Sequence, residues 1–385
     1  MRKTLELIYF NAGGGHRSAA LALKEVIESK HSDWDVSLVN LFEVIDSERY
    51  FQKLTGFAPE DLYNLRLKKG WTLGLTTELK VLQAMIRLSH AKLKRKLQEH
   101  WRATKPDMVV SLVPNFNKVM WDALQQELPA VPYVTVMTDI ADHPPHFWIE
   151  TDQAQHLICG SAQAMAQARV AGYQSHQLTQ TSGMILRPTF YRTSPVDRDQ
   201  VCAELGLNST KPTGLVMFGG NGSNQMLRIA KDLSDTQLIL VCGHNAALAK
   251  KIEALAPSAK HVVLGFTSEV DRLMRLSNFF IGKPGPGSLS EAIHMGLPVI
   301  TFKNALTMPQ ERYNATWIRE NALGIVVSSI REIKAAAQEL IEKLPAFQEN
   351  VARIDNRAVF EVVEALEKII ETSGDQSSVR TVQSQ

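Results

Sequence analysis

The sequence predicts an α/β protein built from two parallel-sheet domains. Short apolar, strand-like runs alternate with helical periods of apolar residues at the start of the chain, and the same alternation begins again near residue 213. The chain has 385 residues, which is long for one hydrophobic core and corresponds to about two domains of usual size. Residues 186–198 lack periodicity and contain two prolines, so we expect the linker there.

The first domain is expected to cover residues 1–187. Apolar runs at 4–11 and 35–41 flank a helical pattern over 16–30, which gives the β-α-β start of a parallel sheet. Residues 44–105 are expected to form a helical insertion. Strands then resume at 107–112, 132–138 and 156–160.

The second domain is expected to cover residues 199–345. Its strands are predicted at 213–219, 236–242, 261–265, 278–282 and 298–302, separated by helical stretches. The region 346–373 contains a last helix over about 355–372. The polar residues 374–385 carry no apolar anchor, so we expect them to be disordered.

Composition excludes several classes of protein. The net charge of +2 is too small to indicate nucleic-acid binding. Three cysteines, Cys159, Cys202 and Cys242, lie far apart and match neither a disulfide framework nor a zinc site, so a reducing compartment is expected. The N-terminus does not resemble a signal peptide, and no apolar run approaches the roughly 18 residues of a membrane span.

Three consecutive glycines, Gly13, Gly14 and Gly15, separate the first strand from the first helix. Ligands of open α/β sheets bind beyond the carboxyl ends of strands, where helix N-termini attract anions. The dinucleotide pattern G-x-G-x-x-G would need a glycine at Ser18, and no GxxxxGK[ST] loop occurs, so NAD and ATP are disfavoured. A plain turn could explain the glycines. His16 adds chemistry, because the helix dipole favours the neutral imidazole that a general base needs.

Two further glycine-rich loops follow predicted strands of the second domain and are expected at one sheet edge. They suit a diphosphate at a helix N-terminus, and Glu291 suits a ribose diol; the alternative for Glu291 is a solvated carboxylate in the first turn. Two neighbouring loops could surround a nucleobase. Phe266 would then form an apolar wall of that site, or it could be a core residue instead. The loop residues are Gly219, Gly220, Gly222, Ser223, Gly285, Pro286, Gly287 and Ser288, with Gly243, Asn245 and Gly265 in the neighbouring loops.

These segments together carry a resemblance to a known family. GGGHRSAALALKEV, MFGGNGS, VCGHN, GFTSEVDRLM and GKPGPGSLSEAIHMGLPVI resemble the monogalactosyldiacylglycerol synthase group of glycosyltransferase family 28, in order over roughly residues 5–370. They resemble more distantly the N-acetylglucosaminyltransferase that makes the peptidoglycan lipid precursor. The resemblance implies a GT-B fold, in which two Rossmann-like domains face each other across a cleft and the last helix crosses back to the first domain.

The resemblance also assigns roles to residues. It implies that Gly13–Gly15, His16 and His143 lie on the acceptor side, that the glycine loops at 219–223 and 285–288 face the diphosphate, and that Glu291 holds the ribose. By the same resemblance Gly243, Asn245, Gly265 and Phe266 surround the uracil, and His244 replaces an arginine of plant relatives. Gln310 and Glu311 are the implied contacts of sugar hydroxyls.

The proton acceptor has two candidates. Transfer requires a base that takes the proton of the acceptor hydroxyl. VMTDIADHPPHFW, residues 136–148, contains the Thr-Asp of the family, so Asp139 is either the base or the group that orients His16. Asp139 and Asp142 could suggest a metal, but the nucleotide half has no D-x-D, and we expect neither a metal nor another cofactor.

A basic and aromatic segment in the insertion suggests contact with a membrane. Arg66, Lys68 and Lys69 flank Trp71, and residues 87–105 carry further cations, which suits an anionic bilayer surface or merely a solvated helix face. The family resemblance favours the bilayer and a peripheral enzyme on the cytoplasmic face of the cell membrane.

The sequence as a whole predicts an inverting glycosyltransferase. It would move galactose or glucose from UDP-galactose or UDP-glucose to diacylglycerol and form a β-glycosyldiacylglycerol. Alternatives are transfer to a glycosylated or polyprenyl-linked lipid, a UDP-sugar epimerase of the same fold, and a non-catalytic membrane-binding protein.

Overall fold

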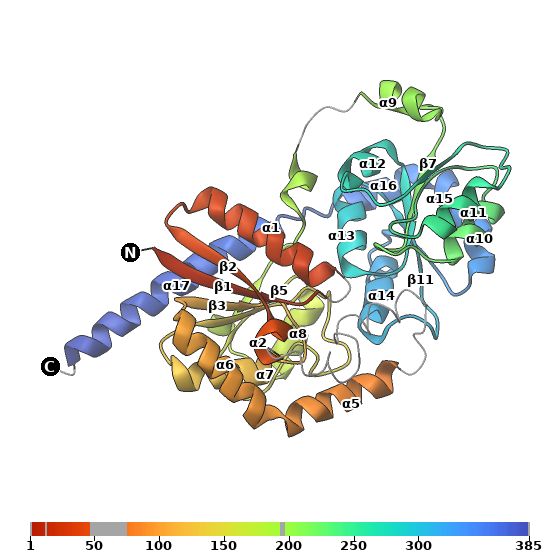
Figure 1. The fold of residues 1–385 in the computed structure, drawn as a ribbon. Helices are drawn as coiled ribbons and strands as arrows, with labels where there is room; N and C mark the ends of the chain where they lie inside the picture. Colours follow the sequence, from red (N-terminus) through yellow and green to blue (C-terminus); the bar gives the residue numbers. More distant parts are fainter. Residues whose placement is uncertain (1, 12–13, 47–74, 193–196, 384–385) are drawn as a thin grey trace. The chain divides into compact units, whose positions relative to one another are not determined.

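The computed structural model describes residues 2–11, 14–46, 75–192 and 197–383 (Figure 1). The chain divides into two compact units. Within the described residues, unit 1 comprises 2–11, 14–46, 75–188 and 357–383, and unit 2 comprises 189–192 and 197–356. The division after Pro188 falls inside the expected linker, where the 3₁₀ turn η2 (Pro188–Tyr191) connects the units.

Unit 1 contains a six-stranded parallel sheet with the order β2-β1-β3-β4-β5-β6. Its strands are β1 (Lys3–Tyr9), β2 (Trp34–Asn40), β3 (Met108–Ser111), β4 (Tyr133–Val136), β5 (His156–Cys159) and β6 (Leu178–Gln180). The alternation of apolar residues predicted the first five. It missed β6, because this short edge strand is mostly polar and only partly buried.

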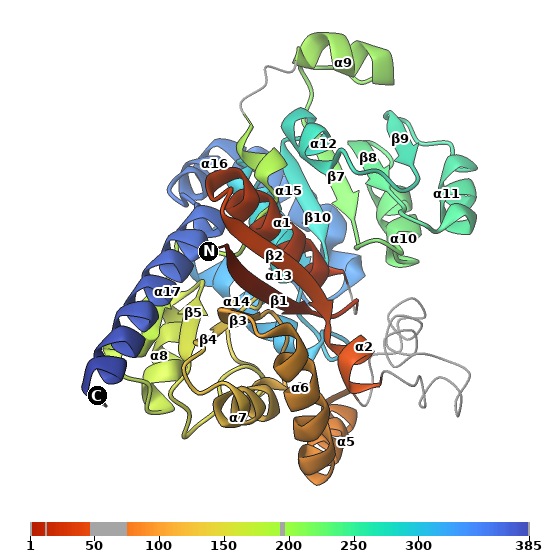
Figure 2. The same cartoon turned by 60° about the vertical axis from the view of Figure 1, so that its left-hand side comes forward.

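Helices cover both faces of this sheet (Figure 2). They are α1 (Gly15–Lys30), α2 (Leu41–Ile45), α5 (Leu75–Leu88), α6 (His90–Thr104), α7 (Asn117–Glu127), α8 (Ala162–Val170), the 3₁₀ turn η1 (Ser175–Gln177) and α17 (Ala358–Gln383). The buried residues Trp101 of α6 and Met120 of α7 belong to one core with Ile8 of β1. The expected helical character of 44–105 is therefore seen in the described residues 75–104.

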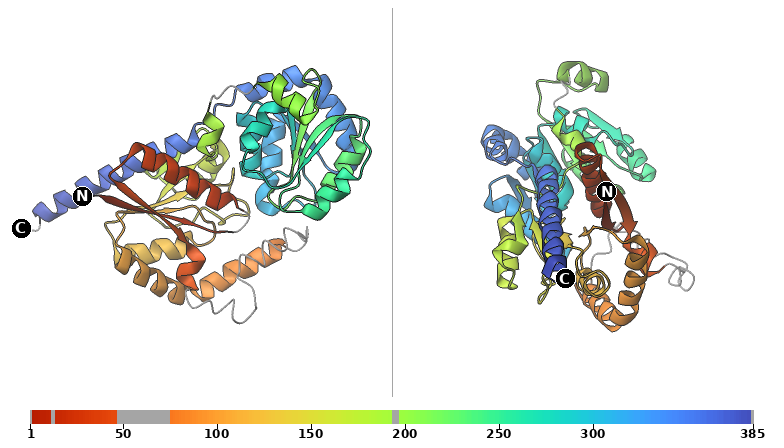
Figure 3. Two further views of the ribbon diagram at one scale, coloured as in Figure 1. Left: turned by 45° about the horizontal axis from the view of Figure 1, so that its top comes forward. Right: turned by 90° about the vertical axis from the view of Figure 1, so that its left-hand side faces the viewer.

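The C-terminal helix α17 packs against α1 of unit 1 (Figure 3). Glu367 Oε1 lies 2.6 Å from both Lys30 Nζ and His31 Nε2 at the end of α1. Glu361 Oε2 accepts hydrogen bonds from the backbone N–H and the hydroxyl of Ser182, at 2.6 and 2.9 Å. The sequence predicted disorder from residue 374, whereas the structure continues α17 to Gln383.

Unit 2 contains a second six-stranded parallel sheet, in the order β12-β11-β10-β7-β8-β9. Its strands are β7 (Thr213–Met217), β8 (Gln237–Val241), β9 (His261–Leu264), β10 (Phe279–Gly282), β11 (Val299–Phe302) and β12 (Gly324–Val327). The sequence predicted all but β12, a short edge strand whose residues are mostly half-buried.

Helices and turns surround this sheet as well. They are α9 (Arg198–Leu205), α10 (Gln225–Asp232), α11 (Ala246–Glu253), α12 (Val270–Leu276), α13 (Pro286–His294), η3 (Pro309–Glu311), α14 (Arg312–Glu320), η4 (Ile330–Glu332), α15 (Ile333–Glu342) and α16 (Leu344–Ala352). Residues of α10, α11 and α15 form one core with the strands; examples are Ile229, Leu248 and Leu340.

Each sheet has one point where the strand order reverses. In unit 1 it lies between β1 and β3, and in unit 2 between β7 and β10. Ligands of open α/β sheets bind at the carboxyl ends of the strands at such a switch point. The topology therefore predicts ligand sites at the loop before α1 in unit 1 and at the loops after β7 and β10 in unit 2.

Candidate active site

The switch point of unit 1 places His16 in the first turn of α1. Gly14 is the N-cap of this helix and has a φ of 80°, a left-handed conformation that favours glycine. A Cβ atom at Gly15 would meet no heavy atom of the described residues within 4 Å, so none of these residues fills the space beside this helix start. Gly13 lies outside the described residues.

The imidazole of His16 is held between aromatic rings and two polar groups. Its centroid lies 6.2 Å from that of Phe10 and 5.9 Å from that of Trp148. Thr138 Oγ1 lies 3.0 Å from His16 Nδ1. Burial lowers the pKa of His16 from 6.5 to about 4, and a hydrogen bond with the backbone of Leu112 partly opposes this shift. The ring is therefore neutral at pH 7.

Asp139 is linked to His16 through Trp148. The carboxylate is buried, with 6% of its surface exposed, and its Oδ2 accepts a hydrogen bond of 2.8 Å from Trp148 Nε1. Asp142 Oδ1 accepts a 2.6 Å bond from the Trp148 backbone N–H. Two carboxylates thus fix the tryptophan that packs on the histidine. Burial raises the pKa of Asp142, and hydrogen bonds from backbone N–H groups oppose the shift. His143 is half-buried in the same loop.

The glycines of the second unit fall into two groups. Gly243 has a φ of 60°, and a Cβ there would lie 2.1 Å from the carbonyl oxygen of Gly220. A Cβ at Gly222 would lie 2.8 Å from the Cys242 carbonyl oxygen. These two glycines allow the loops after β7 and β8 to pack together. At Gly220 and Gly287 a built Cβ would meet no described heavy atom within 4 Å, so these two positions are open.

Helix α13 begins directly after β10. Gly285 is its N-cap and Pro286 its first residue, so the free N–H groups of the first turn follow at Gly287 and Ser288. The Ser288 hydroxyl lies 3.5 Å from the Gly285 carbonyl oxygen. Glu291 lies in the second turn and is half-buried, which corrects the expectation of a first-turn position.

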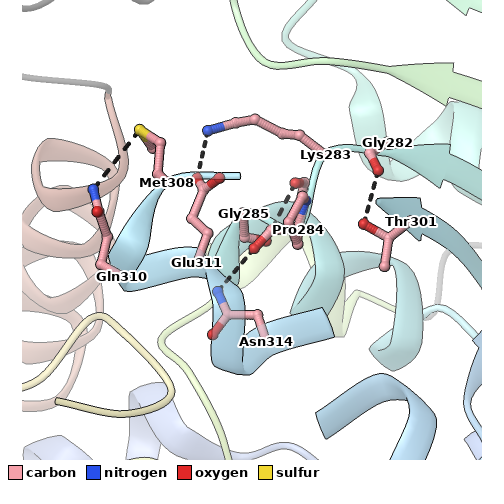
Figure 4. Close-up of polar contacts among 10 residues, drawn as sticks. Gly282, Lys283, Pro284, Gly285, Thr301, Met308, Gln310, Glu311 and Asn314 are labelled. Atoms are coloured by element: carbon pink, nitrogen blue, oxygen red, sulfur yellow. Dashed lines mark hydrogen bonds and ion pairs between the residues drawn. The ribbon is translucent and has the colours of Figure 1, made fainter. Parts of the chain in front are cut away.

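An ion pair at this helix start was not predicted from the sequence. Lys283 Nζ lies 2.6 Å from Glu311 Oε1, and Glu311 is buried with 5% of its surface exposed (Figure 4). Asn314 donates a 2.8 Å bond to the carbonyl oxygen of Pro284, which ties α14 to the loop after β10. Gln310 Nε2 lies 3.8 Å from Met308 Sδ. A signal for Lys283 was present, since GKPGPG places one cation beside the glycines.

The neighbouring loops present an aromatic pair. Phe266 is 62% exposed, so it is not a core residue, and its ring stacks on that of His244 at a centroid distance of 4.3 Å and an angle of 12°. Asn245 accepts a 3.0 Å bond from the Leu248 N–H and caps α11. Gly265 lies close to this loop, since its built Cβ would be 3.8 Å from the Gly243 carbonyl oxygen.

Two remaining sequence expectations concern membrane and metal. Arg66, Lys68, Lys69 and Trp71 lie outside the described residues. Of the helices that the structure describes, none is both long and apolar enough to cross a bilayer. Within the same residues, no three His, Cys, Asp or Glu side chains are grouped in a way that could hold a metal ion.

Two family models match the chain, one on each half. Residues 16–183 match monogalactosyldiacylglycerol (MGDG) synthase, and residues 216–370 match the glycosyltransferase family 28 C-terminal domain. The chain belongs to the monogalactosyldiacylglycerol synthase family. It is therefore a glycosyltransferase, and the family resemblance that the sequence suggested is confirmed.

Full-length relatives support the assignment. The chain is 26% identical over 394 residues to the chloroplastic MGDG synthase of Spinacia oleracea, covering 96% of this chain and 73% of that one. It is also 26% identical over 394 residues to MGDG synthase 1 of Arabidopsis thaliana, covering 96% and 71%.

Solved structures confirm the GT-B fold. MurG of Acinetobacter baumannii matches with a TM-score of 0.64 at 12% identity, over 95% of this chain and 99% of that one. MnaA of S. aureus, solved with UDP, matches with a TM-score of 0.61 at 15% identity, over 96% and 97%. At these identities the likeness concerns the fold alone.

Proposed function

We propose that this protein is an inverting glycosyltransferase that moves galactose or glucose from a UDP-sugar to diacylglycerol and forms a β-glycosyldiacylglycerol. The observation that carries the proposal is the neutral, desolvated His16 at the switch point of the unit that matches MGDG synthase. The relatives are named for a galactosylated diacylglycerol. Among proteins of similar fold, HepE of Anabaena was solved in complex with UDP-glucose, and its structure matches this chain with a TM-score of 0.51.

Unit 1 would hold the acceptor and remove its proton. As the diacylglycerol hydroxyl attacks the anomeric carbon, the His16 ring accepts the hydroxyl proton. The hydrogen bond with the Leu112 backbone favours the protonated ring, so it stabilises the imidazolium as it forms. Asp139 acts through Trp148, which it holds against the imidazole. This arrangement favours His16 over Asp139 as the base. The space beside Gly14 and Gly15 would admit the acceptor. His143, four residues after Asp139, would lie on the same acceptor side.

Unit 2 would hold the diphosphate of the donor at the start of α13. Backbone N–H groups of Gly287 and Ser288 and the helix dipole favour an anion there, and the open space at Gly220 and Gly287 admits it. Lys283 adds a full positive charge at the end of β10, which would stabilise the UDP that leaves. Its pairing with buried Glu311 holds the ammonium in place.

The remaining parts of the donor find partners on neighbouring elements. Gln310 and Glu311 on η3 would contact sugar hydroxyls. Glu291, one turn into α13, would accept hydrogen bonds from the ribose. The exposed Phe266, stacked on His244, offers a flat apolar surface to the uracil. Gly219 and Ser223 belong to the loop after β7 and would complete the diphosphate site.

Because diacylglycerol resides in bilayers, we propose a peripheral enzyme on the cytoplasmic face of the cell membrane. Anionic lipid would attract basic residues such as those of the segment 66–71.

In the deciding experiment, the purified protein is incubated with labelled UDP-galactose or labelled UDP-glucose, with and without vesicles that contain diacylglycerol. The glycosidic linkage of the product is then determined. We expect lipid-dependent formation of one β-glycosyldiacylglycerol. His16→Ala and Asp139→Asn should each slow turnover by at least about 100-fold while UDP binding is kept. Lipid-independent conversion to an isomeric UDP-sugar would show an epimerase instead, and turnover only with a polyprenyl-linked or glycosylated lipid would reassign the acceptor.

A further inference from the structure

The hydroxyl of Thr138 faces one nitrogen of the proposed base. Thr138 Oγ1 lies 3.0 Å from His16 Nδ1, so the contact joins the loop after β4 to the first turn of α1. Thr138 is half-buried, whereas its neighbours Met137 and Asp139 are buried, with 2% and 6% of their surface exposed. The loop after β4 therefore reaches the proposed base one residue before Asp139.

The chain on either side holds Thr138 in place. Met137 packs in the core that contains Trp148, and its backbone N–H donates a 3.0 Å bond to the carbonyl oxygen of Ile158. Asp139 accepts the 2.8 Å bond from Trp148 Nε1. Threonine branches at Cβ, which restricts its χ1 rotamers. The hydroxyl oxygen is therefore fixed opposite Nδ1.

The imidazole of His16 is held on its other sides by aromatic rings. Phe10 meets it edge-on, with an angle of 89° between the two ring planes, and Trp148 lies tilted by 49°. Trp148 is fully buried and is fixed by two carboxylates. Turning the imidazole over would break its contact with Thr138 and disturb both aromatic contacts. Nδ1 therefore stays beside the hydroxyl.

The position of the ring proton decides which nitrogen of His16 can act as the base. A neutral imidazole carries one proton, and its hydrogen-bonding partners determine which nitrogen holds it. Thr138 covers Nδ1 in either tautomer, so an acceptor hydroxyl can approach the ring directly at Nε2. Nε2 offers a lone pair only when the proton is on Nδ1. In that tautomer the Thr138 oxygen accepts the hydrogen bond from Nδ1–H.

We propose that Thr138 is a positioning residue that holds the ring proton of His16 on Nδ1 and so makes Nε2 the atom that accepts the proton of the acceptor hydroxyl. The inference rests on the proposed function. As the hydroxyl oxygen bonds to the anomeric carbon, the bond from this carbon to the diphosphate oxygen breaks, and the hydroxyl proton passes to Nε2. The bond from Nδ1–H to Thr138 is kept throughout, and the hydrogen bond with the Leu112 backbone further stabilises the charged ring.

The tautomer can be measured in the full-length protein without any substrate. Long-range proton–nitrogen correlation spectra of protein with isotope-labelled histidine are recorded near neutral pH, and His16→Asn identifies the His16 signals among those of 11 histidines. We expect a protonated Nδ1 and an unprotonated Nε2. Thr138→Val keeps the shape of the side chain but removes the hydroxyl, so the proton should move to Nε2. A proton on Nε2 in the wild type, or an unchanged Nδ1–H in Thr138→Val, would overturn the inference.

Turnover with diacylglycerol supplies a second measurement. Thr138→Val should lower kcat by at least about tenfold with KM for the UDP-sugar kept, and Thr138→Ser, which retains the hydroxyl, should recover most of the rate. The matched control is Thr135→Val on β4. Thr135 is buried and its hydroxyl donates a 2.6 Å bond to Gln155 Oε1, so this variant also loses a hydrogen bond but should keep the tautomer and kcat. A serine variant as slow as the valine variant would count against the hydroxyl and overturn the inference.

The two measurements separate this inference from the proposed function. If the wild type transfers no sugar to diacylglycerol, the proposed function fails, and the spectra still decide which nitrogen of His16 carries the proton. If the wild type is active and Thr138→Val keeps its kcat, the proposed function stands and the inference falls.

Discussion

Replacing His16 with asparagine should remove one pH-dependent contribution to the stability of unit 1. Burial lowers the pKa of this histidine from 6.5 to about 4 in the folded protein, and unfolding restores the ordinary value. Between these two values the unfolded chain binds a proton that the folded protein does not. The free energy of unfolding therefore falls as the pH decreases through this window, and is unaffected by His16 above about pH 7.

The magnitude follows from the shift. The difference between 6.5 and about 4 corresponds, at 1.36 kcal/mol per pH unit, to about 3 kcal/mol when the window has been crossed. Most of this stability is lost in the upper part of the window: proton linkage lowers the free energy of unfolding by about 2 kcal/mol between pH 7.5 and pH 5. Other groups titrate in the same range, but their contributions cancel when the wild type and the variant are compared at each pH.

Urea unfolding followed by tryptophan fluorescence is the suitable assay. Four of the six tryptophans, Trp34, Trp101, Trp121 and Trp148, belong to unit 1, so the signal reports mainly this unit. Asparagine does not titrate. The stability difference between wild type and variant should shift by about 2 kcal/mol between pH 7.5 and pH 5 in favour of the variant. If the difference is the same at both values, the ring is not desolvated, and the argument for a neutral base fails.

Two further predictions concern unit 2. Lys283→Met should weaken UDP binding in calorimetry by about tenfold and slow turnover by at least about 100-fold, because the leaving diphosphate loses a cation; normal rates would leave Lys283 only as the partner of Glu311. Gly287→Val should preserve the melting temperature and impair UDP binding. Gly243→Ala should destabilise unit 2 by more than about 2 kcal/mol, because the new Cβ would lie 2.1 Å from the Gly220 carbonyl oxygen. Equal effects of the two glycine variants on thermal melting would contradict this division.

Much of the fold could be predicted from local patterns. The interior strands are continuous apolar runs, as in β8 and β10, because a parallel sheet is buried on both faces. Two short edge strands escaped prediction: β6 is mostly polar and partly buried, and β12 was missed although its sequence GIVV is apolar. For the last residues of α17, composition predicted disorder, whereas the structure continues the helix to Gln383.

The candidate site was predictable as a set of loops and not as a set of contacts. Glycines after strands marked the positions where a ligand approaches, and His16 stood out beside them. Thr138, Trp148 and Lys283 were not proposed, because their importance lies in contacts with residues far away in the chain: Thr138 and Trp148 contact His16, and Lys283 contacts Glu311. The patterns also could not tell that Phe266 is exposed.

The sequence by itself determined the two α/β halves, the family and the residue types at the loops, because periodicity and short motifs are local properties. Only the tertiary structure decided which glycines pack against a neighbouring loop and which leave open space. It also decided that His16 is desolvated and that Thr138 faces its Nδ1. Burial depends on every segment that folds over a residue, and no local pattern contains that information.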